Sequence, residues 1–484
     1  MKLLDLLNGV NYEVLKGSLE KEVSHIQYDS RKIKENDMFV CLTGFEVDGH
    51  NYATKAIELG AKVIVCEKEI EINSDDVTVI LVKEGRKALA IMSSNYYGHP
   101  TKNLKLIGVT GTNGKTTSVY LLKAILESAG KKVGLIGTIA NYIGDKKIKS
   151  ERTTPESLEL QKLFKDMVEE NCEYCVMEVS SHSLELDRVY GCEFEVGIFT
   201  NLTRDHLDFH KTFDNYYNAK FKLFERSKAS IINIDDEYGH RILTDVNKLD
   251  EKIVKTYSIK NNSDFKATNI TLKEGDIHFE VNNINYNSIL PGEYNIYNVL
   301  GVIGASNILD IRYEDIQKGL LNVVVPGRCE RIGYKYDIPY DIIIDFAHTP
   351  DGLKNILETL KTFTKNRLIA VYGCGGDRDK VKRAELGRIG TEIADFAVIT
   401  SDNPREEDPM FIIKEILSGI TKTNYLAIEN RAEAIKMALD MAEEGDVVVL
   451  AGKGHENYQI INTGVIHFDE REVVDEILKD KRKK

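Results

Sequence analysis

A glycine-rich turn between an apolar strand and an amphipathic helix constrains the fold of this chain more than any other feature. The turn reads Thr110-Gly111-Thr112-Asn113-Gly114-Lys115-Thr116-Thr117 and follows the apolar run 105–109. Glycines let backbone N–H groups approach phosphates, while Lys115 supplies a cation and Thr116 a hydroxyl for Mg²⁺. Val109 stands where the usual motif has its first glycine, so a plain glycine turn is the alternative. The flanking strand and helix favour a phosphate-binding loop in an α/β domain.

Length and charge disfavour several classes of protein. A chain of 484 residues is long enough for about two to four domains, each with its own core. The formal net charge of −13 and the lack of a long basic run disfavour nonspecific nucleic-acid binding. The start of the sequence lacks the apolar region of a signal peptide, and no later run reaches membrane length. We therefore expect a cytoplasmic protein that binds neither nucleic acid nor membrane.

The cysteines predict a reduced protein. There are seven, scattered from Cys41 to Cys374, and an odd number does not fit a disulfide framework in a chain of this size. Cys172 and Cys175 form a C-x-x-C pair, but no second pair or nearby histidine cluster completes a zinc site. We interpret this pair as part of a buried strand rather than as a metal or redox centre.

Two loops divide the chain into three expected α/β domains, 1–99, 100–327 and 328–484. The loops Gly98-His99-Pro100-Thr101 and Val325-Pro326-Gly327-Arg328 interrupt the periodic segments. The first domain is small, with a helix at 52–59 between strands at 37–42 and 62–66. The second is a P-loop ATPase-like α/β domain with strands expected at 105–109, 133–136, 174–179, 196–199 and 229–233.

The third domain alternates strands and helices regularly. Its strands are expected at 368–372, 397–400 and 447–450, and its helices at 384–394, 410–420 and 432–442. This pattern predicts a Rossmann-like, doubly wound sheet.

Acidic and histidine side chains follow two strands of the second domain. Glu178 ends the strand 174–179, where α/β sheets place ligands, and is a candidate metal ligand; a solvated acid is the alternative. The segment Asp205-His206-Leu207-Asp208 follows the strand 196–199 and suits a Mg²⁺ shell around phosphates better than a zinc site. Lys220 lies on an otherwise apolar helical face, where a snorkelling lysine is the ordinary interpretation.

The segment Arg152-Thr153-Thr154-Pro155-Glu156 predicts the start of a helix. Thr154 suits the N-cap, and Pro155 suits the first helical position because its missing N–H costs nothing there. A helix-capping role alone would explain why a threonine stands at position 154, without any role in binding.

Taken together, these motifs resemble the Mur ligases in order and spacing over nearly the whole chain. In the second domain the resemblance rests on the phosphate loop, Thr153-Thr154-Pro155, Glu178-Val179-Ser180-Ser181-His182, Asp205-His206-Leu207-Asp208 and Ala219-Lys220. In the first it rests on Asp29-Ser30-Arg31 and Thr43-Gly44-Phe45-Glu46-Val47-Asp48-Gly49-His50. In the third it rests on Asp345-Phe346-Ala347-His348-Thr349-Pro350-Asp351, Gly375-Gly376-Asp377-Arg378, Asp402-Asn403-Pro404-Arg405 and Gly452-Lys453-Gly454-His455-Glu456.

The resemblance implies an ATP- and Mg²⁺-dependent ligase that forms an amide bond. The implied substrates are UDP-N-acetylmuramoyl-L-alanyl-D-glutamate and meso-diaminopimelate, and the first domain would bind the uridine nucleotide. ATP would phosphorylate the D-glutamate γ-carboxylate, and the incoming amine would then displace phosphate from the acyl phosphate. The resemblance also implies a CO₂-derived carbamate on Lys220, which would convert a cation into an oxygen ligand.

Site residues are carried over from the same resemblance. The implied ATP contacts are Thr110, Gly111, Thr112, Asn113, Gly114, Lys115, Thr116, Asn295 and Arg328, and the implied Mg²⁺ ligands are Thr116, Glu178, His206 and Lys220. The UDP-muramoyl-dipeptide would contact Ser30, Thr43, Gly44, Arg152, Thr153, Thr154, Ser180 and Arg188. Lys115, Lys220, His206 and His348 would form the catalytic set. Leu186 stands where some relatives have a polar substrate contact.

The third domain would select meso-diaminopimelate through its distal carboxylate and ammonium. Arg405 has the planar fork that binds a carboxylate, Arg378 offers a second, and Asn403 and Glu456 can accept hydrogen bonds from the ammonium. Asp402, Pro404 and Gly452 complete the expected site. The alternative for Asp402-Asn403-Pro404-Arg405 is a turn that closes the strand 397–400.

Three rival functions stay open at this point. Within the ligases they are an L-lysine-adding enzyme of the same family and a folylpolyglutamate synthase-like enzyme, although Asp29-Ser30-Arg31 and Asp402-Asn403-Pro404-Arg405 argue against the latter. From a different class, the chain would be a non-catalytic P-loop nucleotide-binding switch. We expect a monomer.

Overall fold

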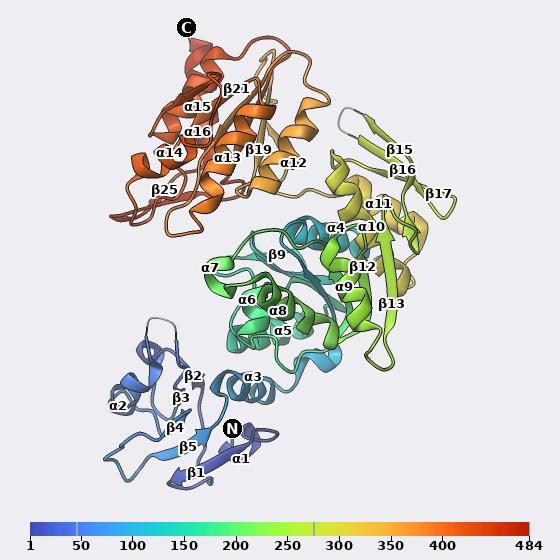
Figure 1. Ribbon diagram of the computed structural model, residues 1–484. Coiled ribbons are helices and arrows are strands. Elements are labelled where there is room, and N and C mark those ends of the chain that lie inside the picture. The colour runs from blue at the N-terminus through green and yellow to red at the C-terminus, as the bar shows by residue number, and fades with distance from the viewer. Residues whose placement is uncertain (45–46, 274–275, 484) are drawn as a thin grey trace. The chain divides into compact units, whose positions relative to one another are not determined.

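The computed structural model describes residues 1–44, 47–273 and 276–483 (Figure 1). The chain forms two compact units. One comprises Met1–Thr110, Lys131–Gly197 and Ala219–Ala229, and the other comprises Gly111–Gly130, Ile198–Asn218 and Ser230–Lys484. Phe45 and Glu46, which belong to a motif singled out above, lie outside the described residues.

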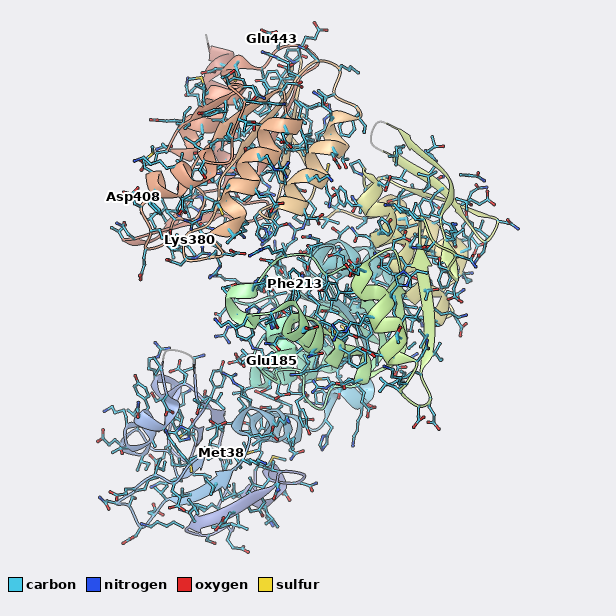
Figure 2. The ribbon with its side chains drawn as sticks, in the orientation of Figure 1. Met38, Glu185, Phe213, Lys380, Asp408 and Glu443 are labelled. Carbon is cyan, nitrogen blue, oxygen red and sulfur yellow. The ribbon has the colours of Figure 1, made fainter. Side chains whose placement is uncertain are left out.

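The N-terminal sheet has five strands in the order β1-β5-β4-β3-β2. Its pairs are parallel except for β1 with β5. Apolar runs such as Val63–Cys66 are buried along their whole length. Met38 of β3, which is labelled in Figure 2, is fully buried. The elements are α1 (Leu3–Leu6), β1 (Tyr12–Lys16), β2 (Ile26–Gln27), β3 (Met38–Val40), α2 (Ala53–Glu58), β4 (Val63–Cys66), β5 (Thr78–Val82) and α3 (Gly85–Tyr96).

The central sheet has nine strands in the order β14-β13-β12-β11-β6-β10-β7-β8-β9. Strand β10 pairs in parallel with β6 and β7, so the strand ends at Thr110 and Glu178 lie at one edge of the sheet. The strands are β6 (Lys105–Thr110), β7 (Val133–Ile136), β8 (Asn141–Ile143), β9 (Lys146–Ile148), β10 (Tyr174–Glu178), β11 (Phe194–Phe199), β12 (Ser227–Asn233), β13 (Ile253–Ser258) and β14 (Phe265–Lys266). The helices are α4 (Lys115–Ser128), α5 (Ser157–Glu169), α6 (Ser181–Glu185), α7 (Leu207–His210), α8 (Phe213–Glu225), α9 (Glu237–Val246), α10 (Glu293–Ile308) and α11 (Tyr313–Asn322).

A small antiparallel sheet and the hairpin β8–β9 were not expected from the sequence. The small sheet has the order β15-β16-β17, with β15 (Thr268–Lys273), β16 (Asp276–Val281) and β17 (Ile284–Ser288). Strand β16 has alternating burial, with Ile277, Phe279 and Val281 turned inward. The sheet is therefore covered on one face.

The C-terminal sheet has six strands in the order β18-β19-β23-β20-β21-β22, parallel except for β18. Its strands are β18 (Glu330–Ile332), β19 (Asp341–Asp345), β20 (Leu368–Tyr372), β21 (Phe396–Ile399), β22 (Tyr425–Ala427) and β23 (Val447–Ala451). Its helices are α12 (Pro350–Lys361), α13 (Val381–Ile393), α14 (Pro409–Leu417), α15 (Arg431–Met441) and α16 (Glu470–Lys483). A hairpin of β24 (Tyr458–Ile461) and β25 (Gly464–His467) precedes α16.

Alternate residues of the C-terminal strands enter two separate cores, one on each face of the sheet. In β20, Ala370 packs in the core formed with α12, α13 and α14, while its neighbour Val371 packs in the core formed with α15 and α16. Helices therefore cover both faces (Figure 1). This arrangement confirms the predicted doubly wound fold.

The predicted start of helix α5 is wrong. The helix begins at Ser157 with Glu156 as its N-cap residue. The Thr154 hydroxyl instead donates to the Glu178 carbonyl at 2.8 Å and accepts from the Ser180 N–H at 3.1 Å. Thr154 therefore joins its loop to the chain that leaves β10, which is why it is unavailable for capping.

In the described part of the chain, no helix combines the length and the apolar character that spanning a membrane requires.

Candidate functional site

The phosphate loop needs glycine at two positions. Gly111 and Gly114 have φ of +154° and +87°. A Cβ at Gly111 would lie 1.9 Å from Thr200 Oγ1, and one at Gly114 would lie 2.3 Å from Asn298 Oδ1. No side chain fits at either place, so the backbone there stays open to a ligand.

Hydrogen bonds hold the loop in its curved shape. The Lys115 ammonium donates to the carbonyls of Gly111 at 2.7 Å and Thr112 at 2.8 Å. The Asn113 N–H donates to Asn201 Oδ1 at 2.9 Å. Helix α4 starts at Lys115, so the N–H groups of its first turn and its positive dipole end face the loop. The loop is thus built to hold an anion such as a polyphosphate.

A cavity of about 450 Å³ adjoins this loop. Its lining includes Asn113, Gly114, Asp235, Tyr297 and Asn298. A cavity of this size accommodates a nucleotide-sized ligand.

Asn295, an implied ATP contact, is buried and absent from this lining. Its Oδ1 accepts from Asn298 Nδ2 at 2.9 Å. Asn295 therefore orients Asn298, which the sequence reasoning did not single out although Asn298 lies in the same segment.

Arg328 and His348 lie in the same unit as the phosphate loop. Arg328 Nη2 donates to Thr116 Oγ1 at 3.1 Å. His348 Nδ1 lies 2.8 Å from the Phe346 carbonyl oxygen, and burial lowers the pKa of His348. A neutral imidazole is therefore favoured at neutral pH.

The acid and histidine next to α7 interact with each other. His206 Nε2 lies 3.4 Å from Asp205 Oδ2. Burial alone would raise the pKa of Asp205, but His206, His348 and Lys382 lower it to about 2. Asp205 is therefore ionised, and its charge partly offsets the effect of burial on His348.

Glu178 is buried, so the interpretation as a solvated acid is wrong. Only 1% of the residue is exposed. Its carboxylate accepts from the Thr138 N–H at 2.8 Å and from the Thr138 hydroxyl at 3.0 Å. The Thr138 hydroxyl also lies 3.0 Å from Thr153 Oγ1. A fixed, desolvated carboxylate of this kind suits a hard cation.

Lys220 does not snorkel, because only 1% of it is exposed. Lys220 and Glu178 belong to the first unit, and Thr116 and His206 belong to the second. Among the described residues no group of three or more His, Cys, Asp or Glu is placed to hold a metal. The metal-ligand set therefore remains a prediction.

Three arginines surround Glu156 in the first unit. Glu156 forms ion pairs with Arg152 at 2.7 Å, Arg188 at 2.9 Å and Arg86 at 3.4 Å. Burial lowers the pKa of Arg188, whose Nη1 donates to the Thr154 carbonyl at 3.1 Å. Three cations face one buried anion, which leaves a positive cluster suited to a phosphate or carboxylate group.

A cavity of about 1030 Å³ includes part of this cluster in its lining. Ser30, Arg86, Arg152 and Glu156 line it, as does Phe39 of β3. Arg86 was missed by the sequence reasoning, since no local motif marks it. The Thr43 hydroxyl donates to Glu67 at 2.7 Å and is not in this lining.

Two of the buried cysteines pack in a hydrophobic core of the first unit. Cys175 of β10 and Cys172 lie among buried apolar side chains, and burial raises the pKa of the Cys175 thiol. Both cysteines are buried as expected, but only Cys175 lies in a strand, because β10 begins at Tyr174.

The expected amino-acid residues follow three neighbouring parallel strands of the C-terminal sheet. Gly375–Arg378 follows β20, Asp402–Arg405 follows β21 and Gly452–Glu456 follows β23. Because carboxyl ends of parallel strands meet at one edge, the three segments share the edge at which such sheets bind ligands. Arg405 adopts a left-handed φ of +55°, and its Nη1 donates to the Gly376 carbonyl at 2.7 Å. Burial and the neighbouring Arg378 lower the pKa of Arg405.

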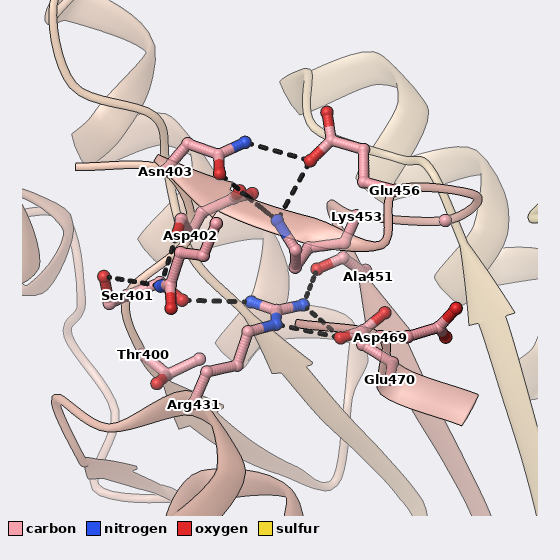
Figure 3. A network of polar contacts seen from close by, with 12 residues as sticks. Thr400, Ser401, Asp402, Asn403, Arg431, Ala451, Lys453, Glu456, Asp469 and Glu470 are labelled. Carbon is pink, nitrogen blue, oxygen red and sulfur yellow. Dashed lines mark hydrogen bonds and ion pairs between the residues drawn. The ribbon is translucent and has the colours of Figure 1, made fainter. Parts of the chain in front are cut away.

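The Asn403 side chain makes different hydrogen bonds from those that we expected. Its Oδ1 accepts from the Lys453 ammonium at 3.3 Å and from the Ile460 N–H at 3.0 Å, while its Nδ2 donates to Glu456 Oε2 at 2.9 Å (Figure 3). Because both lone pairs of the amide oxygen are in use, Asn403 cannot also accept from a substrate ammonium. The expected acceptor role is wrong, and only donation remains.

Comparison with known proteins matches the chain along its length. Residues 22–97 match the Mur ligase family catalytic domain, residues 109–306 the Mur ligase middle domain, and residues 327–454 the Mur ligase glutamate ligase domain. A UDP-N-acetylmuramoyl-L-alanyl-D-glutamate–2,6-diaminopimelate ligase of Clostridium perfringens is 59% identical, covering 99% of this chain and 100% of the relative. The enzyme of the same name from Clostridium botulinum is 57% identical, with the same coverage.

A solved structure gives the same result at the level of the fold. A UDP-N-acetylmuramoyl-L-alanyl-D-glutamate–2,6-diaminopimelate ligase superposes with a TM-score of 0.71 and 29% identity, covering 100% of this chain and 99% of the other. The similarity extends over the whole chain in sequence and in structure, and the chain therefore belongs to the Mur ligase family.

Proposed function

We propose that this ligase joins meso-diaminopimelate to UDP-N-acetylmuramoyl-L-alanyl-D-glutamate, with ATP hydrolysed to ADP and phosphate, during synthesis of the peptidoglycan precursor. The observation that carries the proposal is the 59% identity, over 99% of the chain, to a relative named for this reaction. We also propose that the domain boundaries lie between residues 99 and 100 and between residues 327 and 328.

The proposed chemistry has two steps. In the first, the D-glutamate γ-carboxylate attacks the γ-phosphorus of ATP, and ADP leaves with the bridging electrons. Lys115 and the N–H groups of the phosphate loop hold the transferred phosphoryl group and offset its charge. In the second, the amine of diaminopimelate attacks the acyl phosphate carbon, and phosphate leaves as the amide forms.

The arginine cluster around Glu156 supports binding of the anionic dipeptide substrate. Arg152 and Arg188 offer planar forks to a carboxylate or phosphate, and Glu156 keeps these forks ordered before substrate binds. Ser30, in the lining of the larger cavity, would contact the uridine nucleotide.

We propose Thr116, Glu178, His206 and a carbamate on Lys220 as the residues that hold Mg²⁺. The buried Glu178 carboxylate, fixed by Thr138, has the hard oxygen chemistry that this ion prefers. When bound, Mg²⁺ would neutralise the phosphate charge that develops in the first step. The carbamate would form from the neutral Lys220 amine and CO₂ with loss of one proton.

One assay tests the proposal against its rivals. Phosphate release by the purified chain with ATP, Mg²⁺ and the UDP-muramoyl dipeptide is compared for meso-diaminopimelate, L-lysine, L-ornithine and no amino acid. We expect release only with meso-diaminopimelate. Release with L-lysine alone would identify the lysine-adding enzyme, and release that ignores every amino acid would identify a nucleotide switch. We further propose that the enzyme acts in the cytoplasm as a monomer.

A further inference from the structure

Lys453 is a fully buried lysine next to the proposed amino-acid site. None of its side chain is exposed. Lysine is almost never fully buried unless it is paired, because its ammonium loses its hydration. The ammonium lies 2.9 Å from Glu456 Oε2, 3.3 Å from Asn403 Oδ1 and 3.8 Å from Asp402 Oδ1. Three side chains of the expected site therefore surround one cation (Figure 3).

These contacts determine which way the Asn403 amide faces. An ammonium and a main-chain N–H can only donate, and the Lys453 ammonium and the Ile460 N–H both face the same amide atom. That atom must be the oxygen, so the amide nitrogen is directed to Glu456. Either donor alone would leave a weaker preference, and the Lys453 charge strengthens it although its contact of 3.3 Å is longer than the main-chain one of 3.0 Å.

We propose that Lys453 is a positioning residue for amino-acid selection, acting through the Asn403 amide. By holding Asn403 Oδ1, it keeps an N–H donor beside the Glu456 carboxylate. One amino-acid head group carries a carboxylate and an ammonium. The Asn403 N–H complements the carboxylate, and the neighbouring Glu456 carboxylate complements the ammonium. The inference rests on the proposed function, in which this edge of the sheet binds meso-diaminopimelate.

A purely structural role for Lys453 makes a different prediction. Lys453 also neutralises Asp402 and Glu456, both largely buried, so its loss would destabilise the domain in any case. A structural defect lowers the melting temperature and disturbs all kinetic constants together. A positioning defect raises the KM for the amino acid selectively and depends on Asn403.

The experiment uses the full-length enzyme and the phosphate-release assay, with meso-diaminopimelate and ATP varied separately. The variants are Lys453→Met, Lys453→Gln, Asn403→Ala, Asn403→Asp and Lys453→Met combined with Asn403→Ala. Arg367→Met is the matched control, because it also leaves a fully buried carboxylate, Asp446, without its 2.7 Å partner. Arg367 and Asp446 precede β20 and β23, so they lie at the opposite edge of the sheet.

We expect Lys453→Met to raise the KM for meso-diaminopimelate about tenfold or more, as for the loss of an ionic hydrogen bond, while the KM for ATP changes less than about twofold. In the Asn403→Ala background, Lys453→Met should raise the KM for meso-diaminopimelate by less than about a further threefold. Lys453→Gln keeps a neutral N–H donor for Asn403 Oδ1 and should recover part of the loss. Arg367→Met should lower the melting temperature without changing the KM for meso-diaminopimelate.

Asn403→Asp keeps Lys453 and tests the amide orientation directly. It replaces the donor with an acceptor and should raise the KM for meso-diaminopimelate about as much as Asn403→Ala does. An unchanged or lower KM would overturn the inference, as would additive effects of Lys453→Met and Asn403→Ala or equal defects in the Met and Gln variants. If Asn403→Ala itself leaves that KM unchanged, the amino-acid site of the proposed function fails as well.

Discussion

Thr138 holds the Glu178 carboxylate at both of its oxygens, through a main-chain N–H at 2.8 Å and a side-chain hydroxyl at 3.0 Å. Residues that orient a metal ligand in this way typically change metal affinity by about 10- to 100-fold when they are lost. Thr138 therefore offers a test of the proposed metal site that leaves every proposed ligand in place.

Thr138→Val removes the hydroxyl and keeps the main-chain N–H. We expect the half-saturating Mg²⁺ concentration to rise about tenfold, with kcat at saturating Mg²⁺ changed less than about threefold. Thr244→Val is the control, since among the described residues the Thr244 hydroxyl bonds only within its own helix, to the His240 carbonyl at 2.9 Å. A Mg²⁺ titration that matches the unmodified enzyme would argue against Glu178 as a ligand.

Lys115→Ala should abolish catalysis while the fold persists. The Lys115 ammonium bonds to loop carbonyls, and its charge matters most when phosphates are bound. We expect kcat to fall by about 100-fold or more with an unchanged circular dichroism spectrum. Lys123→Ala, on the same helix α4 and paired with Glu127, should stay active. Near-normal turnover of Lys115→Ala would remove the phosphate-loop assignment.

Much of the fold was predictable because strands and helices of an α/β protein have apolar patterns of different period. Strand β7 has the expected bounds, 133–136, and the alternation in the third domain gave the doubly wound sheet correctly. Strands β15 to β17 were missed because they carry many polar residues and bury only one face, so their apolar signal is weak.

The site was predictable where a local motif marks it and unpredictable where distant segments meet. The phosphate loop was assigned from its own sequence, and Asp402–Arg405 from its position after a strand together with the other motifs of the third domain; both assignments stay predictions. Arg86 pairs with Glu156, 70 positions away, and only the tertiary fold shows this. The burial of Lys453 was also hidden, since a lysine in a glycine-rich segment is ordinarily exposed.

Lys220→Arg should be inactive, because a guanidinium cannot take up CO₂ and stays positive at every working pH. We expect a loss of about 100-fold or more. Lys222→Arg is a close control, since Lys222 lies on the same helix in an exposed pair with Glu185 at 2.7 Å. A crystal structure of the Mg²⁺-bound enzyme should show three additional atoms on Lys220. An unmodified lysine in an active, Mg²⁺-bound crystal would refute the carbamate.

Arg405→Ala should raise the KM for meso-diaminopimelate far more than that for ATP. An ionic hydrogen bond contributes about 1.5–3 kcal/mol, which corresponds to about 10- to 150-fold in KM. Arg405→Lys should not restore binding, because a lysine lacks the planar fork. Arg388→Ala, which breaks an exposed ion pair with Glu392, should leave the KM for meso-diaminopimelate unchanged. Equal turnover of L-lysine and meso-diaminopimelate by the unmodified enzyme would overturn the assignment of this site.

Arg431 and Glu470 form an ion pair in which neither side chain is exposed, with 2.8 Å between Arg431 Nη2 and Glu470 Oε1 (Figure 3). Arg431 also donates to the carbonyls of Ser401 at 3.3 Å and Ala451 at 2.8 Å, so it joins the chain after β21 to the end of β23. Arg431→Met leaves a buried carboxylate and two carbonyls without their donor. We expect it to destabilise the protein by about 3–5 kcal/mol in urea unfolding.

Replacing both Arg431 and Glu470 should lower the free energy of unfolding much less than replacing Arg431 alone. Within the described residues Glu470 Oε2 is buried without a hydrogen-bond partner, so the pair does not fully offset its own desolvation. The double variant Arg431→Met and Glu470→Met removes both buried charges, and we expect it to be at least about 1–2 kcal/mol more stable than Arg431→Met alone. Arg388→Met replaces an exposed arginine and is the control for the effect of an Arg-to-Met change alone on the free energy of unfolding. A double variant less stable than Arg431→Met would show that the Glu470 carboxylate stabilises the domain even without its partner.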